Sequence, residues 1–217
     1  MQSIADRLSN PFGMQAPCMH ACSEEISGVY GYGDPNADFH LIGDHPGRHG
    51  GETTGIPFTG KPASDRLLAV LADVNLVDIT GTNPSGSELF MSYLHLCCPS
   101  DGTNPTEAEY QDLERFFDAE LRAVAAHVLL PVGRKPLQHV LEHFTSHPYQ
   151  GITPSAVHAA ELSGRGFLVI PIKDPSDWRA HDEEKLKATL TSVLDSDYNQ
   201  ETDLTRFFPT NRQYLVR

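Results

Sequence analysis

The sequence predicts an α/β protein: a three-layer α/β/α sandwich around a central, mostly parallel sheet of four strands. Short apolar runs alternate with longer segments of helical period, and this alternation indicates parallel strands covered on both faces by helices. The chain has 217 residues, which is long enough to bury a real core, and its apolar and charged fractions (39% and 21%) are ordinary for a globular protein.

The predicted elements follow one another in a regular order. The four strands are expected at residues 39–42, 89–97, 127–132 and 166–172. The first helix is indicated by an apolar stripe within residues 62–73, and the clearest helix follows Pro105, with acids in its first turn and an apolar face up to Val124. Two more helices are predicted at 136–144 and 175–194, and a polar loop at 75–88.

The whole chain is interpreted as one domain, with a core over residues 10–194 and a loosely packed tail over 195–217. No run of about 18 apolar residues is present, so a transmembrane helix is not expected. The first 14 residues lack the basic start and apolar centre of a signal peptide, which favours the cytoplasm. Four cysteines in an intracellular chain are then more often thiols or metal ligands than disulfides.

The formal charge of -13 by itself argues against nucleic-acid binding, because phosphates are normally held by Lys and Arg clusters. However, the acidic excess is spread along the chain, Lys is scarce, Arg is about twice as frequent as Lys, and Asp exceeds Glu. This pattern suits a cytoplasm rich in potassium chloride, where phosphate contacts are screened in any case. A halophilic source is therefore expected, with an ordinary acidic mesophile as the alternative.

A glycine- and proline-rich loop follows the first predicted strand and is the most distinctive segment of the chain. Residues 43–60 read GDHPGRHGGETTGIPFTG and show no helical period. Glycine where no turn is obvious usually lets the backbone approach a ligand closely. Asp44, His45 and Glu52 add acid and histidine side chains, and Phe58 offers one aromatic face. The loop is therefore predicted to hold a ligand.

This loop resembles the first motif of the uracil-DNA glycosylase superfamily, most closely its thermostable iron–sulfur branch (family 4) and the related sequences of halophilic archaea. The family pattern is roughly Gly-Glu-(Ala/Gly)-Pro-Gly, an acidic stretch, then Gly-x-Pro-Phe-(Val/Thr)-Gly; here residues 43–47 read GDHPG and residues 55–60 read GIPFTG. Further similar segments occur in the family's order, at residues 31–38, 97–106, 132–133 and 166–171. The resemblance covers about residues 10–178 and implies the α/β/α fold of that family.

The second motif of the family is His-Pro-Ser, whose histidine hydrogen-bonds the uracil carbonyl and stabilises the leaving uracil anion. At that place this chain has Asp174, Pro175 and Ser176, and a carboxylate there would repel the anion. The family's asparagine that reads the uracil edge corresponds to Tyr93, and its first-motif glutamate corresponds to Asp44. The resemblance implies that the 174–176 loop lies against the DNA backbone.

The resemblance gives each loop side chain a functional role, and each also has a structural alternative. Asp44 would polarise the water that attacks the anomeric carbon of a flipped nucleotide, or it would cap the loop amides. His45 would donate to a phosphate or to the base, or it would simply be solvated, and Glu52 would be an alternative base. Phe58 would stack on the base or fill the core. The other residues expected at the base are Tyr93, Pro46 and Gly47.

The four cysteines form two local pairs, Cys18 with Cys22 and Cys97 with Cys98. Family 4 proteins hold a four-iron, four-sulfur cluster with four cysteines; Cys18 and Cys97 fall at two of those places, and Gln15 and Leu113 occupy the other two. Adjacent cysteines on a strand point to opposite faces, so Cys97 and Cys98 are not expected to bind one ion without a bend. No cofactor is the leading expectation, with a degenerate iron–sulfur cluster or zinc as alternatives. The substitute ligands considered are His20, His95 and Asp101.

The function implied by the resemblance is hydrolysis of the N-glycosidic bond of a flipped, deaminated base by a monomeric protein, with single- or double-stranded DNA as its partner. Two alternatives stay open. The first is a silent paralogue that binds DNA or a base without cleaving it. The second is a metal- or redox-dependent structural protein organised by its cysteines.

Overall fold

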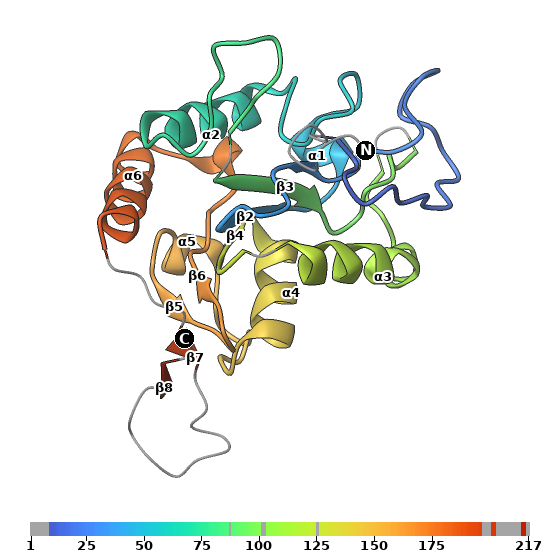
Figure 1. Cartoon of the computed structure of the whole chain (residues 1–217). Helices are drawn as coiled ribbons and strands as arrows, with labels where there is room; N and C mark the ends of the chain where they lie inside the picture. Colours follow the sequence, from blue (N-terminus) through green and yellow to red (C-terminus); the bar gives the residue numbers. More distant parts are fainter. Residues whose placement is uncertain are drawn as a thin grey trace. The chain divides into compact units, whose positions relative to one another are not determined.

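The computed structural model in Figure 1 forms two compact units, Met1–Ala126 and His127–Arg217. The predicted single domain over residues 1–217 stays a prediction, and the predicted tail lies largely outside the described residues. The structure describes residues 9–86, 88–100, 103–124 and 126–196, and the backbone of two short paired strands, β7 (Glu201–Thr202) and β8 (Tyr214–Leu215).

Unit 1 is organised on three strands, β1 (Tyr32–Gly33), β2 (Phe39–Gly43) and β3 (Leu89–Tyr93). β2 and β3 are parallel and in register from Phe39 opposite Leu89 to Gly43 opposite Tyr93, while β1 runs antiparallel to β3. Every residue of β2 and β3 is buried. Such strands read as nearly continuous apolar runs, which is why the sequence shows both of them.

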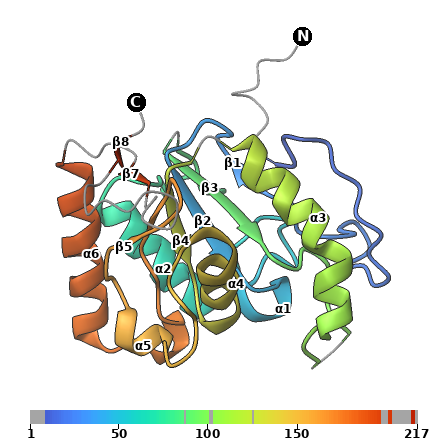
Figure 2. The same cartoon turned by 90° about the horizontal axis from the view of Figure 1, so that it is seen from below.

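The helices of unit 1 are α1 (Pro46–His49), α2 (Pro62–Asp73) and α3 (Glu107–Ala123). α3 begins in a capping box, in which the Thr106 side chain accepts from the Glu109 amide and the Glu109 carboxylate accepts from the Thr106 amide. Its buried face carries Leu113, Phe117 and Leu121. The helices predicted within residues 62–73 and after Pro105 are therefore confirmed; Figure 2 shows both along their length.

A buried polar group interrupts the apolar face of α3. Glu120 is 1% exposed and accepts a hydrogen bond from the Gly31 amide at 3.0 Å. It also shares a hydrogen bond with Ser92, whose hydroxyl lies 2.8 Å from the His40 Nε2 atom. Burial raises the pKa of Glu120 to about 8 and lowers that of His40 to about 3. At neutral pH the interior of unit 1 therefore holds a protonated acid and a neutral imidazole.

Unit 2 contains β4 (Val128–Pro131) parallel to β6 (Leu168–Val169), with β5 (Leu162–Ser163) antiparallel to β6. A bridge between Val132 and Ile172 extends the parallel pair. The helices of this unit are α4 (Arg134–Phe144), α5 (Pro154–Val157), η2 (Pro175–Asp177) and α6 (Ala180–Leu194).

The α/β class and the mostly parallel pairing are confirmed, and the four predicted strands correspond to β2, β3, β4 and β6. The strand count is corrected by β1 and β5, which have two residues each and are too short to show a period. The helix predicted at 175–194 is also corrected: it is interrupted at Trp178, whose backbone is extended, and α6 starts only at Ala180. Among the described residues, no helix has the length and apolar character needed to cross a membrane.

Candidate functional site

Asp44 is the first residue after β2 and is held from three sides, all within unit 1. Its backbone N–H donates to Nδ1 of His49 at 3.0 Å, and its carbonyl accepts from the His95 amide at 3.0 Å. The Tyr110 hydroxyl donates to its Oδ1 atom. The residue is only 7% exposed, so its carboxylate is fixed in a mostly dry setting.

Tyr110 is the member of the site that sequence reasoning missed. It lies in the first turn of α3, 66 residues from Asp44. Burial first, and then the charge of Asp44, raise the pKa of the Tyr110 hydroxyl, so it keeps its proton. One signal was available in the sequence: Tyr110 lies at the start of a helix that follows a strand. Ligands of α/β proteins bind at the edge of the sheet formed by the carboxyl ends of its strands.

Two histidines complete the surroundings of Asp44. His45 is 2% exposed, and burial lowers its pKa to about 4 although Asp44 partly opposes the shift. The His95 ring packs edge-on against Tyr110 with 5.5 Å between centroids. Its Nδ1–H donates to the Cys97 carbonyl at 2.9 Å, and burial lowers its pKa. Both rings are therefore neutral at pH 7, and His45 is buried where solvation was the structural alternative.

Tyr93 and Phe58 close the glycine-rich loop. The Tyr93 hydroxyl accepts from the Phe58 amide at 2.6 Å and donates to the Gly50 carbonyl at 3.0 Å, so its proton is engaged within the loop. The Phe58 ring is fully buried and stacks on His49 at 5.4 Å, which matches the core alternative. The rings of Tyr93 and Phe58 both cover Gly43, where an added Cβ would lie 2.5 Å from Tyr93 and 2.7 Å from Phe58.

The remaining loop residues have structural partners. Pro46 is buried at the start of α1, and a Cβ on Gly47 would lie 3.0 Å from His45 Nδ1. Glu52 forms an ion pair with Lys61 at 3.3 Å, and its side chain is 39% exposed. Lys61 also donates to the Gly47 carbonyl, so this pair fastens the outside of the loop. The structure thus separates the partly exposed Glu52 from the buried Asp44, His45 and His95 and the half-buried Tyr110.

The second candidate motif lies in unit 2 and is a local turn. Asp174 is 7% exposed, and its Oδ1 atom accepts from the amide of Ser176 at 3.0 Å and from its hydroxyl at 2.6 Å. These bonds cap η2, which starts at Pro175. The next contacts stiffen the turn, since Lys173 pairs with Asp182 at 2.9 Å and its carbonyl accepts from the Trp178 indole at 2.7 Å.

All four cysteines are oxidised, which corrects the expectation of thiols or metal ligands. Cys18 is bonded to Cys97 and Cys22 to Cys98, with Cα separations of 5.3 and 5.1 Å. The physical reason is proximity: the N-terminal segment brings a separate cysteine within bonding distance of each of the adjacent residues 97 and 98. Of the substitute ligands, Asp101 lies outside the described residues.

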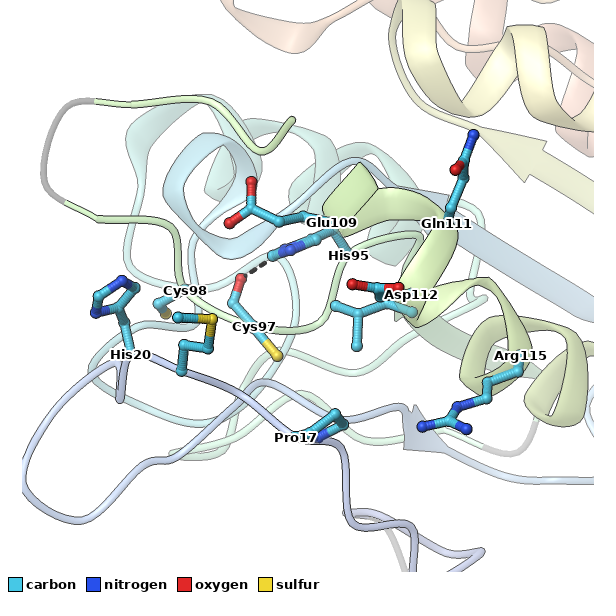
Figure 3. Close-up of a pocket in the computed structure, with 11 residues that line it drawn as sticks. Pro17, His20, His95, Cys97, Cys98, Glu109, Gln111, Asp112 and Arg115 are labelled. Atoms are coloured by element: carbon cyan, nitrogen blue, oxygen red, sulfur yellow. Dashed lines mark hydrogen bonds between the residues drawn. The ribbon is translucent and has the colours of Figure 1, made fainter. Parts of the chain in front are cut away.

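A pocket of about 380 Å³ lies beside these disulfides, as Figure 3 shows. Its walls come from the N-terminal segment, from the residues after β3 and from α3. His95 reaches it from the segment after β3, and Glu109 and Arg115 from α3. The rest of the lining is formed by Pro17, Met19, His20, Cys97, Cys98, Gln111, Asp112 and Leu113.

Comparison with known proteins assigns this architecture to a family. The family model of the uracil DNA glycosylase superfamily matches residues 30–196, which is more than half of the chain and includes both candidate motifs. The chain belongs to the uracil DNA glycosylase superfamily.

Among superfamily relatives, the chain is similar to the Type-5 uracil-DNA glycosylase of Thermus thermophilus, with 31% identity over 131 residues, which cover 56% of this chain and 59% of the relative. The Type-5 enzyme of Mycobacterium leprae is 29% identical over 104 residues, 46% of this chain and 45% of the relative. That of Pyrobaculum aerophilum is 26% identical over 168 residues, 75% of this chain and 72% of the relative. The chain therefore spans less than two thirds of the first two relatives.

The iron–sulfur cluster implied by the superfamily resemblance does not fit the residues present. Leu113 is 4% exposed and packs in an apolar cluster with Leu96 and Cys97, and an apolar side chain offers no ligand atom. Gln15 is exposed. The sulfur atoms of Cys18 and Cys97 are bonded to each other, so neither is a thiolate in this form.

Proposed function

We propose that this chain is a DNA glycosylase that hydrolyses the N-glycosidic bond of a flipped, deaminated base in DNA. The observation that carries the proposal is the buried carboxylate of Asp44 in the first motif, with Oδ1 bound by Tyr110 and Oδ2 making no hydrogen bond to any described residue. An acid held in this way can orient a water molecule and stabilise positive charge on the sugar.

The reaction follows from these atoms. As the bond between C1′ and the base breaks, its electron pair leaves with the base and the sugar becomes oxocarbenium-like. Asp44 stabilises that charge and accepts the proton of the water that attacks C1′. The His45 Nδ1 atom is buried and makes no hydrogen bond within the described residues. This nitrogen of the neutral ring is therefore available to form a hydrogen bond with the departing base.

The other predicted site residues have roles around this centre. Phe58 supports the loop from the core, Pro46 and Gly47 bring the backbone close to the base, and the turn at residues 174–176 contacts the DNA backbone. We also propose a monomer that works at high salt and that, among the branches of the superfamily, stands nearest to family 4 and its haloarchaeal relatives. These proposals rest on the motifs at residues 43–60 and on the charge of -13.

A glycosylase assay tests the function. Single- and double-stranded oligonucleotides containing uracil, hypoxanthine or xanthine are incubated with the protein at 0.1 M and at molar potassium chloride, and abasic sites are detected by alkaline cleavage. Release of one of these bases, faster at molar salt, is the expected result. No release under any condition contradicts the proposal.

A silent paralogue that binds damaged DNA is the second candidate function. It is favoured by one observation, the carboxylate of Asp174 at the place of the family's leaving-group histidine. The same oligonucleotides separate the two candidates, because a silent paralogue binds the damaged strands more tightly than undamaged ones and releases nothing.

We further propose that the protein carries no iron–sulfur cluster or zinc and that the two disulfides fasten the N-terminal segment instead. The support is the pairing of Cys18 with Cys97 and of Cys22 with Cys98. Protein purified without oxygen is expected to be colourless, with less than one cluster per chain by iron and sulfide analysis. About four irons per chain, or one bound zinc, contradicts this expectation.

A further inference from the structure

We propose that Tyr110 is the positioning residue of the reaction: its hydroxyl turns the Asp44 carboxylate so that Oδ2 faces the attacking water. This inference rests on the proposed glycosylase function and adds a residue from α3 to a site otherwise built on the loop after β2.

The start of α3 places the Tyr110 hydroxyl. The capping box of Thr106 and Glu109 fixes the first turn of the helix, and Tyr110 is the fourth helical residue. Helical side chains lean toward the N-terminal end, so this ring reaches back over the first turn. There its hydroxyl meets Asp44 Oδ1.

The main chain of Asp44 is already fixed without Tyr110. Its amide is bound to His49 and its carbonyl to the His95 amide, which continues the pairing of β2 with β3. The freedom that remains is rotation of the side chain about χ1 and χ2. The hydroxyl of Tyr110 makes the only hydrogen bond to this carboxylate within the described residues, so it decides which oxygen stays open.

The Tyr110 ring is itself held in place. His95 packs edge-on against it at 5.5 Å, and the orientation of His95 is set by its bond to the Cys97 carbonyl. The titratable groups that face Tyr110 are Asp44 from the loop, Arg48 from α1, Glu107 from α3 and His95 after β3. Because burial and Asp44 keep the hydroxyl protonated, Tyr110 orients the carboxylate and does not exchange its own proton.

The test compares Tyr110→Phe with Tyr32→Phe in the full-length protein. Tyr32 is a matched control, because it lies on β1 of the same unit and its hydroxyl also donates one hydrogen bond, to the Pro84 carbonyl at 2.6 Å. Base release is measured as kcat and KM on the best single-stranded substrate, from pH 4.5 to 9. Binding is measured on oligonucleotides with a cationic pyrrolidine or a neutral tetrahydrofuran in place of the damaged nucleotide.

Tyr110→Phe is expected to lower kcat by about 10- to 100-fold with KM within twofold, because the lost bond is one to a charged group. The variant also loses the preference for the pyrrolidine oligonucleotide that the parent shows. Tyr32→Phe is expected to keep both properties, even if it melts earlier.

The outcomes separate this inference from the proposed function. A parent that releases base, beside a Tyr110→Phe variant with the same kcat and pyrrolidine preference, overturns the role of Tyr110 alone. A parent with neither base release nor pyrrolidine preference overturns the glycosylase function and this inference with it. Equal losses in Tyr110→Phe and Tyr32→Phe show a general effect of removing a buried hydroxyl and also overturn the inference.

Discussion

Asp44 and Asp174 are equally buried, at 7% exposed, and each follows the end of a strand, yet they are held in opposite ways. The hydroxyl on Asp44 comes from 66 residues away, whereas that on Asp174 comes from Ser176, two residues on. A carboxylate bound by its own turn needs only that turn to form. A carboxylate bound from a distant helix requires the whole unit to fold around it, and this is the arrangement expected of a reacting group.

The same contrast extends to the two units. In unit 1, Glu120 binds the Gly31 amide 89 residues away, and the disulfides join residues 79 and 76 apart. In unit 2, the Lys185 and Thr189 side chains donate to the carbonyls of His158 and Ala159, 27 and 30 residues away, so these bonds span shorter stretches of chain. The charge differs as well: unit 1 has 6 Lys and Arg against 18 Asp and Glu, and unit 2 has 10 against 11. Phosphate contacts are therefore expected mainly from unit 2.

The largest expected effect separates the two aspartates directly. Asp44→Asn is expected to lower base release by about 10²- to 10⁴-fold, because the neutral amide can neither accept the proton of water nor stabilise the sugar cation. Affinity for damaged DNA stays nearly unchanged. The matched control is Asp174→Asn, which keeps a capping oxygen and should keep its rate. Similar losses of rate in both variants would remove the distinction between the two residues.

Reduction of the disulfides is expected to destabilise unit 1. In the chain-entropy account, closing a loop of about 80 residues stabilises the fold by roughly 4 kcal/mol. Urea denaturation with and without dithiothreitol measures the difference, and thiol counting confirms that four thiols appear. The variant with Cys22→Ser and Cys98→Ser keeps one bond and should show most of the loss, because the second bond closes only a short loop once the first has formed. An equal free energy of unfolding with and without dithiothreitol would contradict the stabilisation of the N-terminal segment by the two disulfides.

The buried Glu120 should make the stability of the protein depend on pH. In the folded chain Glu120 keeps its proton up to about pH 8, whereas an ordinary glutamate in the unfolded chain loses it near pH 4.3. Between these values the folded state binds more protons, so the free energy of unfolding falls as pH rises, by at most about 1.4 kcal/mol per pH unit. Glu120→Gln should remove this slope between pH 5 and 8. Parallel pH profiles for parent and variant would show that the Glu120 proton does not control stability.

The smallest effect is expected at the local turn. Asp174→Ala removes the cap on Ser176 and should lower the free energy of unfolding by about 1 kcal/mol. Since Asp174 caps its own turn through Ser176, kcat should stay within twofold of the parent. Denaturation and the base-release assay together measure both quantities. A tenfold change in kcat would mean that this carboxylate takes part in the reaction.

Periodicity and apolar runs were sufficient to predict the larger elements. β2 and α3 could be predicted because a buried strand is apolar throughout and a long helix repeats its apolar face. The helix expected from residue 175 onward was wrong in its first turns, since the cap formed by Asp174 and the stop at Trp178 depend on side-chain bonds that no period reveals.

The site was predictable only in part. Asp44 and His45 were found through the loop in which they lie, but Tyr110 was missed, because its role depends on where α3 meets that loop and on nothing in its own segment. The engagement of Tyr93 by Gly50 and Phe58 could not be read from the sequence either. The prediction of reduced cysteines was wrong for a different reason: the redox state was inferred from the expected compartment and not from contacts.

The adjacency of Cys97 and Cys98 also affects how the oxidised protein is prepared. Four cysteines allow three pairings, and one of them exchanges the partners of these two neighbours, joining Cys18 to Cys98 and Cys22 to Cys97. The exchanged isomer has the same mass and the same absence of free thiols. It would, however, exchange the two points at which the N-terminal segment is attached after β3. Mass and thiol counting therefore cannot distinguish the two isomers in a refolded sample. Cleavage between residues 97 and 98 followed by peptide mapping shows which cysteines are paired.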